Sequence, residues 1–266
     1  MNFKNIRKSV VSGSFYPDKK EEILKYINHF NSIDFKTEIF EDIKAIIVPH
    51  AGYIYSGFTA NLAYQLVSSS KKQIKRVVVI GPSHRVYLKG ASVAIYDEYE
   101  TPLGNLKIDK EFSQNLIDKY DFLDFNIECE FEHSTETQAP FIKHYFENVQ
   151  LVEIIYGEIN YEDLSKVINE VLSDADNFVV ISTDLSHFYT LEEAQKLDNI
   201  CLEAINKKDL KFFDYCEACG KVGVKAIINW AIKNDFDTKI LNYCTSADVT
   251  KDKSRVVGYT SALIGK

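Results

Sequence analysis

Three of the six histidines follow short, mostly apolar runs, and a fourth follows a weaker version of this pattern, Glu130-Phe131-Glu132. All four stand near a glycine, proline, serine or acidic residue. They are His50 after residues 45–49, His84 after 77–83, His133 after 130–132 and His187 after 178–184. Short β-branched runs predict strands buried on both faces of an α/β sheet. Ligand sites in such sheets gather at the carboxyl ends of the strands. We therefore expect these histidines to share one site.

His50 and His84 are the first candidates for metal ligands. His50 lies in residues 49–57, where Gly52 and Gly57 permit close backbone approach or positive φ. His84 follows Gly81-Pro82-Ser83, a stiff turn after an expected strand. One such histidine alone is usually a hydrogen-bonded structural residue. Two with the same placement favour a metal, because neutral imidazole is the commonest metal-binding side chain.

Asp184 and His187 lie in a polar turn, residues 182–187, that closes the third apolar run. An Asx-type turn and a catalytic role are equally good interpretations of Asp184. For His187 we favour a role in proton exchange or metal binding, because imidazole titrates near neutrality. His133 and Glu136 stand at the start of an expected helix and could reach the site. For Glu136 the favoured interpretation is that it complements the helix dipole.

Cys219 precedes an expected helix over residues 222–234 and forms a C-x-x-C pair with Cys216. A thiol at a helix N-terminus beside Lys221 can have a lowered pKa, which favours the metal-binding thiolate. The pair also permits a zinc cluster, although the sequence has no second pair, or a thioredoxin-type dithiol.

The odd number of cysteines, five, in a chain with no recognisable export signal suggests reduced thiols instead of a disulfide framework. Buried, free cysteines commonly act as small apolar residues. This interpretation applies to Cys129, Cys201 and Cys244.

Helical and strand patterns alternate along the chain. Helices are expected over residues 18–30, 59–68, 110–120, 135–146, 161–172, 191–206 and 222–234. Thr135 with Gln138 and Thr190 with Glu193 fit the capping-box pattern. Later strands, over 239–245 and 255–264, favour an antiparallel addition. The pattern predicts a three-layer αβα sandwich around a mixed, largely parallel sheet. His29 and His144 are expected on helix faces.

Composition limits the classes of partner. A formal net charge of -8 argues against nucleic acid, which requires clustered Lys and Arg. One basic patch, formed by Lys71, Lys72, Lys75 and Arg76, is best interpreted as a solvated helix end. No apolar run is long enough for a signal peptide or a membrane span. We therefore expect a single cytoplasmic domain, residues 1–266, with no membrane partner.

Taken together, these motifs resemble the Memo family, which includes the AmmeMemoRadiSam system protein B proteins. The resemblance extends from residue 12 to the final strand. It is carried, in order, by residues 12–16, 49–53, 81–84, 101–109, 132–136, 182–187 and 219–220.

Memo proteins in turn resemble the class III extradiol dioxygenases, which are non-haem iron enzymes. The resemblance implies that His50, His84 and Cys219 bind one metal ion, most readily Fe(II), with Asp184 and His187 as catalytic residues beside it. The dioxygenases use two histidines and a carboxylate, so a thiolate could shift the preference to copper or zinc. The residues expected to contact substrate are Phe15, Tyr53, Tyr55, His133 and Glu136.

The resemblance implies an O2-dependent or other redox reaction on a small molecule. One alternative is a binding protein that holds a ligand or peptide without turnover. Another is a zinc hydrolase in which His187 activates water. The family also implies a functional link to a radical SAM protein and an AMMECR1-like partner.

Overall fold

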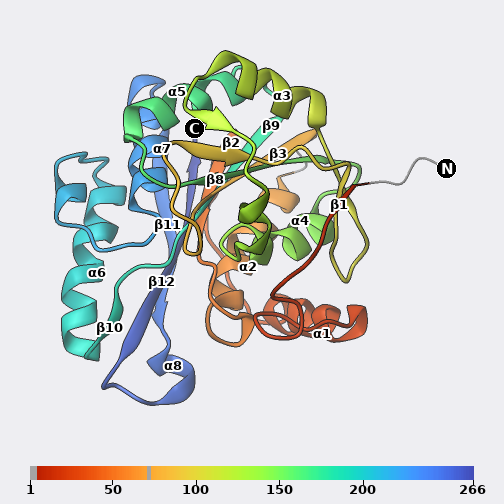
Figure 1. Cartoon of the computed structure of the whole chain (residues 1–266). Helices are drawn as coiled ribbons and strands as arrows, with labels where there is room; N and C mark the ends of the chain where they lie inside the picture. The colour runs from red at the N-terminus through yellow and green to blue at the C-terminus, as the bar shows by residue number, and fades with distance from the viewer. Residues whose placement is uncertain (1–4, 71–72) are drawn as a thin grey trace.

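A computed structural model of the chain describes residues 5–70 and 73–266 (Figure 1). Within them, one sheet of 12 strands has the main order β1-β5-β6-β8-β3-β9-β2-β12-β10, with β11 paired to β12, and β4 to β7 and β8. The strands are β1 (Ile6–Arg7), β2 (Ile43–Val48), β3 (Arg76–Pro82), β4 (Ala91–Val93), β5 (Glu98–Tyr99), β6 (Leu106–Ile108), β7 (Leu123–Asp124), β8 (Gln150–Tyr156), β9 (Asn177–Ser182), β10 (His187–Tyr189), β11 (Asp237–Thr245) and β12 (Val256–Gly265).

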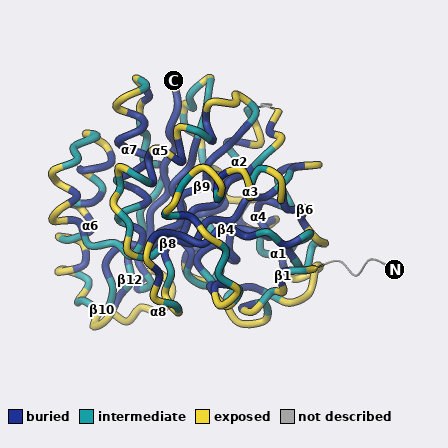
Figure 2. Tube along the Cα trace, turned by 45° about the horizontal axis from the view of Figure 1, so that its top comes forward, coloured by how far each residue is buried: buried dark blue, intermediate teal, exposed yellow. Residues whose placement is uncertain are grey.

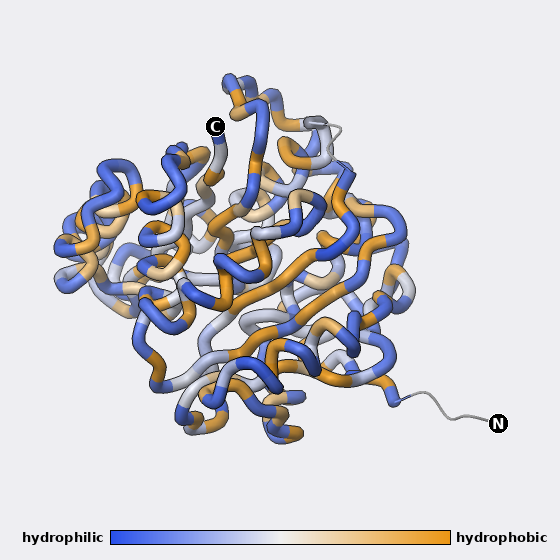
Figure 3. Tube along the Cα trace, turned by 90° about the horizontal axis from the view of Figure 1, so that it is seen from above, coloured by the Kyte–Doolittle hydropathy of each residue, from blue (hydrophilic) through white to orange (hydrophobic). Residues whose placement is uncertain are grey.

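The centre of the sheet consists of the apolar runs seen in the sequence. Strands β8, β3, β9 and β2 pair in parallel, and β12 pairs antiparallel with β2 and with β11. Figure 3 shows the apolar central strands beneath more polar loops. Val48 of β2 lies opposite Ser182 of β9 in the register. These two strands therefore end level with each other, and the loops that follow them start side by side.

Helices cover both faces of the sheet. They are α1 (Lys20–Asn31), α2 (Tyr53–Ser69), α3 (Lys110–Lys119), α4 (Ala139–Tyr145), α5 (Tyr161–Val171), α6 (Leu191–Asn206), α7 (Lys221–Lys233) and α8 (Ala247–Thr250), with 3-10 turns at Ile127–Phe131, Glu136–Gln138 and Phe212–Asp214. Figure 2 shows the buried strands between helices whose outer sides are exposed.

Alternating side chains of the central strands divide the apolar core into two layers. Ile47, Ile80 and Ile181 pack with α5, α6 and α7 on one face of the sheet. Val48 and Val180 pack with α1, α2 and α4 on the other face. Because successive strand residues point to opposite faces, each run fills both layers. The predicted three-layer αβα sandwich with a mixed, mostly parallel sheet is confirmed.

Two predicted details are wrong, and both lie near the site. Helix α2 begins at Tyr53 instead of residue 59, because Gly52 provides its N-cap and the Tyr53 amide donates to the carbonyl of Phe15. The predicted helix over 135–146 divides into a 3-10 turn and α4. The Thr135 hydroxyl makes no cap and donates instead to Glu153.

The capping box at Thr190 and Glu193 is confirmed. Part of the predicted basic patch, residues 71–72, lies outside the described residues. Of its other members, Lys75 pairs with Asp176 and Arg76 with Asp109. No helix in the described ranges has the length and apolarity needed to cross a membrane.

Candidate metal centre

Three histidines meet beyond the carboxyl ends of the central strands. His50 follows β2, His84 follows β3, and His133 follows the 3-10 turn Ile127–Phe131. One ring nitrogen from each of them lies within 4.8 Å of the others, so this group could hold a metal ion. The ring centroids are 4.7 to 5.4 Å apart. His50 is buried, whereas the side chain of His84 is 31% exposed. The centre therefore opens to solvent on the His84 side.

The Nδ1 atoms of the three rings face other protein groups. His50 Nδ1 lies 2.9 Å from Ser182 Oγ, and His84 Nδ1 lies 3.0 Å from Glu132 Oε1. His133 Nδ1 is 3.0 Å from the same Glu132 oxygen, although it has no hydrogen-bond geometry there. Neighbours of this kind orient metal-binding imidazoles and leave Nε2 for the metal.

Glu132 is the shared anchor of His84 and His133. It is buried, and its carboxylate also accepts hydrogen bonds from the amides of His84, His133 and Ser134. Burial would raise the pKa of Glu132, but the adjacent His133 and His84 rings and the His84 amide hold it well below its usual range. Glu132 therefore stays ionised, fixes the His84 ring and holds the His133 backbone through its amide.

The environment of His50 favours its neutral, metal-binding form. Burial lowers the pKa of His50 to about 4, outweighing the nearby Asp184 carboxylate, which would raise it. Asp184 Oδ1 accepts a hydrogen bond of 2.8 Å from the His50 amide, and Oδ2 lies 4.0 Å from Nε2. Asp184 thus holds the His50 backbone and places a carboxylate beside the ring.

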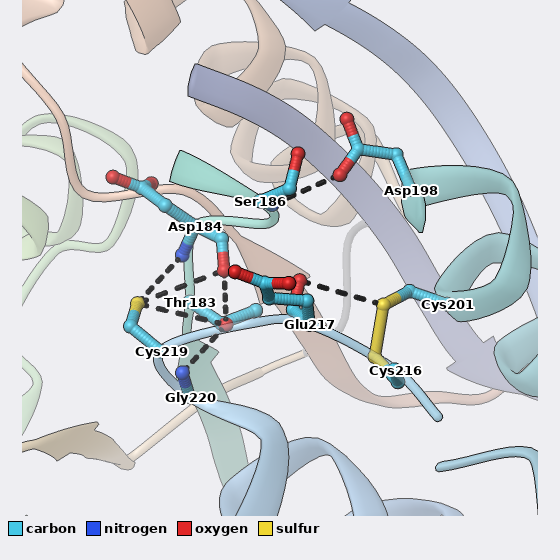
Figure 4. Close-up of a disulfide and its surroundings, with 9 residues drawn as sticks. All are labelled: Thr183, Asp184, Ser186, Asp198, Cys201, Cys216, Glu217, Cys219 and Gly220. Atoms are coloured by element: carbon cyan, nitrogen blue, oxygen red, sulfur yellow. Dashed lines mark hydrogen bonds between the residues drawn. A yellow bond between two sulfur atoms is a disulfide. The ribbon is translucent and has the colours of Figure 1, made fainter. Parts of the chain in front are cut away.

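Cys219 stands beside His50. Its Sγ atom lies 3.3 Å from His50 Nε2. The same atom accepts a hydrogen bond of 3.2 Å from the Asp184 amide (Figure 4). The expected lowering of its pKa is wrong. Burial and then the charge of Asp184 raise the pKa of Cys219 to about 12, because they outweigh the hydrogen bonds with the Asp184 backbone, the Thr183 side chain and the Gly220 backbone, which lower it.

The structure thus brings the three predicted ligands, His50, His84 and Cys219, into one region and adds His133. From the sequence, His133 was expected in the shared site, but it was assigned to the substrate contacts and not to the metal ligands. It reaches the centre through the 3-10 turn and Glu132. Its position in a Glu-His-Ser sequence was the signal available, and a tertiary contact was needed to interpret it. Which of the four side chains coordinate remains a prediction.

His187 begins β10, where it pairs with Val257 of β12. Within the described ranges, no hydrogen bond or ring contact joins His187 to the histidine cluster; its ring contact is with Phe188. Phe188 has a positive φ of 67°, which is unusual for an aromatic residue and accompanies an irregular pairing of β10 with β12. The catalytic role of His187 stays a prediction.

The predicted substrate contacts occupy different environments. Phe15 lies against His133, with ring centroids 4.9 Å apart, and Tyr55 is exposed. Tyr53 is buried, stacks on Phe141 and donates its hydroxyl to the carbonyl of Thr137. Of these three aromatic residues, Phe15 is therefore the one with a ring contact to a histidine of the centre. The contacts of Tyr53 are those of a core residue.

Glu136 is completely buried, and the protein itself satisfies its carboxylate. It accepts hydrogen bonds from Arg7 at 2.6 Å, from the Tyr16 hydroxyl at 2.8 Å and from the amides of Val10 and Val11. These contacts tie the N-terminal segment over the site. We therefore interpret Glu136 as a structural anchor, in place of the earlier interpretation that it complements the helix dipole.

A hollow of about 440 Å³ adjoins the centre. Its lining includes His84, Arg85, Tyr87, Glu158 and Cys219. The side chains of two predicted ligands therefore border a space large enough for a small molecule.

Fold and site together define an αβα protein with a candidate histidine metal centre at the ends of its parallel strands. The chain belongs to the Memo family, since residues 7–263 match the Memo-like protein family. It is 35% identical to a MEMO1 family protein of Aquifex aeolicus, the match covering 96% of this chain and 97% of the relative. It is 32% identical to a MEMO1 family protein of Methanobrevibacter smithii, the match covering 97% of this chain and 99% of the relative. It is also 32% identical to a MEMO1 family protein of Nitrosopumilus maritimus, over 96% of this chain and 98% of the relative.

Proposed function

We propose that the protein binds one redox-active metal ion, with Fe(II) as the preferred candidate, and uses it in an O2-dependent reaction on a small molecule. The observation that carries this proposal is the approach of His50, His84 and His133 to within 4.8 Å, beside the Cys219 thiol and an open hollow. Imidazole and thiolate donors suit iron, copper and zinc and are poor ligands for magnesium or calcium.

The residues present fit such an ion. His50, His84 and Cys219 are the proposed ligands, and His133 is available as a further one. The carboxylate of Asp184 offers the alternative set of two histidines and a carboxylate that is typical of non-haem iron. A bound ion would supply redox chemistry and polarise a substrate oxygen.

The remaining residues prepare the site. Ser182 orients the His50 ring and Glu132 orients the His84 ring, which reduces the rearrangement needed when metal enters. The substrate enters from the hollow beside His84, where Arg85 and Glu158 offer opposite charges for orientation. In this proposal His187 exchanges protons with the substrate.

Oxygen consumption tests the catalytic part of the proposal. Protein purified without oxygen and reconstituted with Fe(II) is supplied with O2 and a panel of catechols and small phenols. We expect substrate-dependent O2 consumption that is lost in His84→Ala and retained in His29→Ala, since His29 is an exposed residue of α1. Tight Fe(II) binding without consumption for any compound would contradict the redox function and favour a ligand-binding protein.

A zinc hydrolase is the second candidate, and the three-histidine group favours it. Three histidines with an open position form a common catalytic zinc site, in which zinc lowers the pKa of bound water. Elemental analysis after exposure to equimolar iron, copper and zinc separates the candidates. Retention of zinc alone at one equivalent would replace the redox proposal with hydrolysis.

A further inference from the structure

Helix α6 contacts two of the loops that carry candidate site residues, the one with Asp184 and the one with Cys219. Asp198 and Cys201 stand one turn apart on this helix, and both are completely buried. Asp198 Oδ1 accepts a hydrogen bond of 2.9 Å from the Ser186 amide, in the loop that contains Asp184. Cys201 forms a disulfide with Cys216, in the loop that contains Cys219 (Figure 4). The prediction of reduced thiols is thus wrong for Cys201 and Cys216. The packing of α6 against the second loop brings these two residues together.

The two loops are also joined directly to each other. The Cys219 amide donates to the carbonyl of Asp184 at 3.2 Å, and the Asp184 amide donates to Cys219 Sγ. The Gly220 amide donates to Thr183 Oγ1 at 2.9 Å. In Figure 4 the Cys219 sulfur points toward Asp184 and away from the disulfide. The position of this sulfur beside His50 therefore depends on where the second loop is held.

Two buried groups anchor the start of that loop: the Phe213 side chain, which is 1% exposed and packs in the same core cluster as Cys216, and the disulfide. Tyr215 is 75% exposed, and Phe212 is also exposed. Glu217 accepts a hydrogen bond from the Tyr189 hydroxyl, but both side chains are only partly buried. Cys216, in contrast, is 4% exposed and is bonded to the fully buried Cys201. The disulfide is the covalent restraint nearest to Cys219.

We propose that the Cys201–Cys216 disulfide is a redox-responsive site that holds Cys219 at the histidine cluster in its oxidised form and loosens it when reduced. The part of this inference that makes Cys219 a metal ligand rests on the proposed function. The restraint on the loop does not. The disulfide thereby acts as a positioning element for the site.

The reaction is thiol–disulfide exchange with a dithiol reductant. A thiolate of the reductant attacks Cys216 Sγ, a new sulfur–sulfur bond forms, and Cys201 leaves as a thiolate that takes up a proton. The second thiol of the reductant then displaces Cys216, so the reductant ends as a disulfide and the protein gains two thiols. Because both sulfurs are buried, we expect attack to require local opening of the loop.

Alkylation of Cys219 tests this proposal without any metal. Metal-free oxidised protein, the same protein reduced with a phosphine and desalted, and the Cys201→Ser/Cys216→Ser variant are treated with iodoacetamide. Peptide mass spectrometry then follows each cysteine. We expect Cys219 to react at least about tenfold faster in the reduced protein and in the variant, because a loosened loop releases Cys219 from its hydrogen bonds with Asp184 and exposes the sulfur further. Cys129 and Cys244 are internal controls, and their rates should not change.

Two results would overturn the proposal. One is an unchanged Cys219 rate in the reduced, still folded protein, with folding checked by circular dichroism. The other is alkylation of Cys201 and Cys216 in unreduced, denatured protein, since it would show that no disulfide exists. The reduced wild type keeps the test decisive even where the double variant fails to fold.

Cobalt binding provides the second readout and separates this inference from the proposed function. We expect Co(II) to give a thiolate charge-transfer band in the oxidised protein, and reduction to weaken Co(II) binding by about 10- to 100-fold, as for loss of a supporting contact. Absence of Co(II) binding in both forms, with the alkylation difference intact, would contradict only the metal function. Equal Co(II) affinity and equal bands in both forms would overturn the positioning role.

Discussion

The histidine side chains at the centre differ in burial, and His50 is the most buried of the three. Its ring already has a polar partner, the hydroxyl of Ser182. A buried neutral imidazole links folding to pH. Its pKa is about 4 in the folded protein against 6.5 ordinarily, so between these values the unfolded chain binds the extra proton.

The free energy of unfolding of the metal-free protein should therefore fall as the pH drops from 6.5 to about 4. Below that range His50 is protonated in both the folded and the unfolded state, so it lowers the stability no further. The expected loss from His50 is roughly 3 kcal/mol. Urea unfolding across this range measures it, with His50→Gln as the variant that lacks the titrating ring. An equally steep pH dependence in His50→Gln would show that other groups cause it.

Residue types alone indicated the chemistry of the site only in part. His50 and His84 were chosen because each follows an apolar run and stands near glycine and proline, and Cys219 was added because of the resemblance to the Memo family. The structure places all three in one region. The anchoring by Glu132 and the burial that raises the pKa of Cys219 depend on residues distant in sequence. Local pattern carries no information about either.

At the scale of elements, the N-terminal segment is tied to the sheet by the buried Arg7–Glu136 pair. Glu136→Gln would remove the nearer of the two buried carboxylates that pair with Arg7, leaving Glu153 at 3.6 Å. We expect this change to destabilise the protein by about 3–5 kcal/mol in urea unfolding, as for other broken buried pairs. Glu100→Gln is the matched control, since it removes the exposed Lys8–Glu100 pair, and should cost less than about 1 kcal/mol. Equal effects of the two changes would argue against the anchor.

The start of α7 approaches the end of β9 closely. A Cβ atom on Gly220 would lie 2.5 Å from Thr183 Cβ and 2.7 Å from the carbonyl oxygen of Ser182. We expect Gly220→Ala to push α7 away, to destabilise the protein by about 1–3 kcal/mol and to weaken metal binding. Gly104→Ala is the control for glycine loss, since its Cβ would meet only the end of Lys143, although its positive φ adds strain. Unchanged metal affinity in Gly220→Ala would show that this contact does not position Cys219.

Elements were predicted well where the sequence pattern was long, as in the central strands and in α5 to α7. They were predicted less well near the site. Tyr53 and Thr135 respond there to tertiary partners, the Phe15 carbonyl and the Glu153 carboxylate, which override local preference. The pairing of Cys201 with Cys216 likewise depends on a tertiary contact that the local sequence does not indicate.

Across the whole molecule, the disulfide should also contribute to global stability. It closes a loop with a sequence separation of 15, and closing a loop of that length stabilises a protein by about 3 kcal/mol. Urea unfolding of oxidised protein and of Cys201→Ser/Cys216→Ser measures this contribution, with Cys244→Ser as a control for the loss of a free thiol. No difference between oxidised protein and the double variant would contradict it.

The three-layer fold followed from the alternation of strands and helices, and the shared site followed from the rule that parallel strands present their carboxyl ends together. What the chain does with the site depends on a ligand that sequence pattern does not specify. The whole-molecule hypothesis is therefore that β2, β3 and the loops after β9 and α6 assemble one metal centre.

Anaerobic Fe(II) titration of the purified protein, followed by calorimetry, tests this hypothesis most directly. Convergence of His50, His84 and Cys219 predicts one ion per chain and binding more than about 100-fold weaker in His50→Ala and Cys219→Ser, with His29→Ala unchanged. Binding of the metal by His50→Ala and Cys219→Ser as tightly as by the wild type would contradict it.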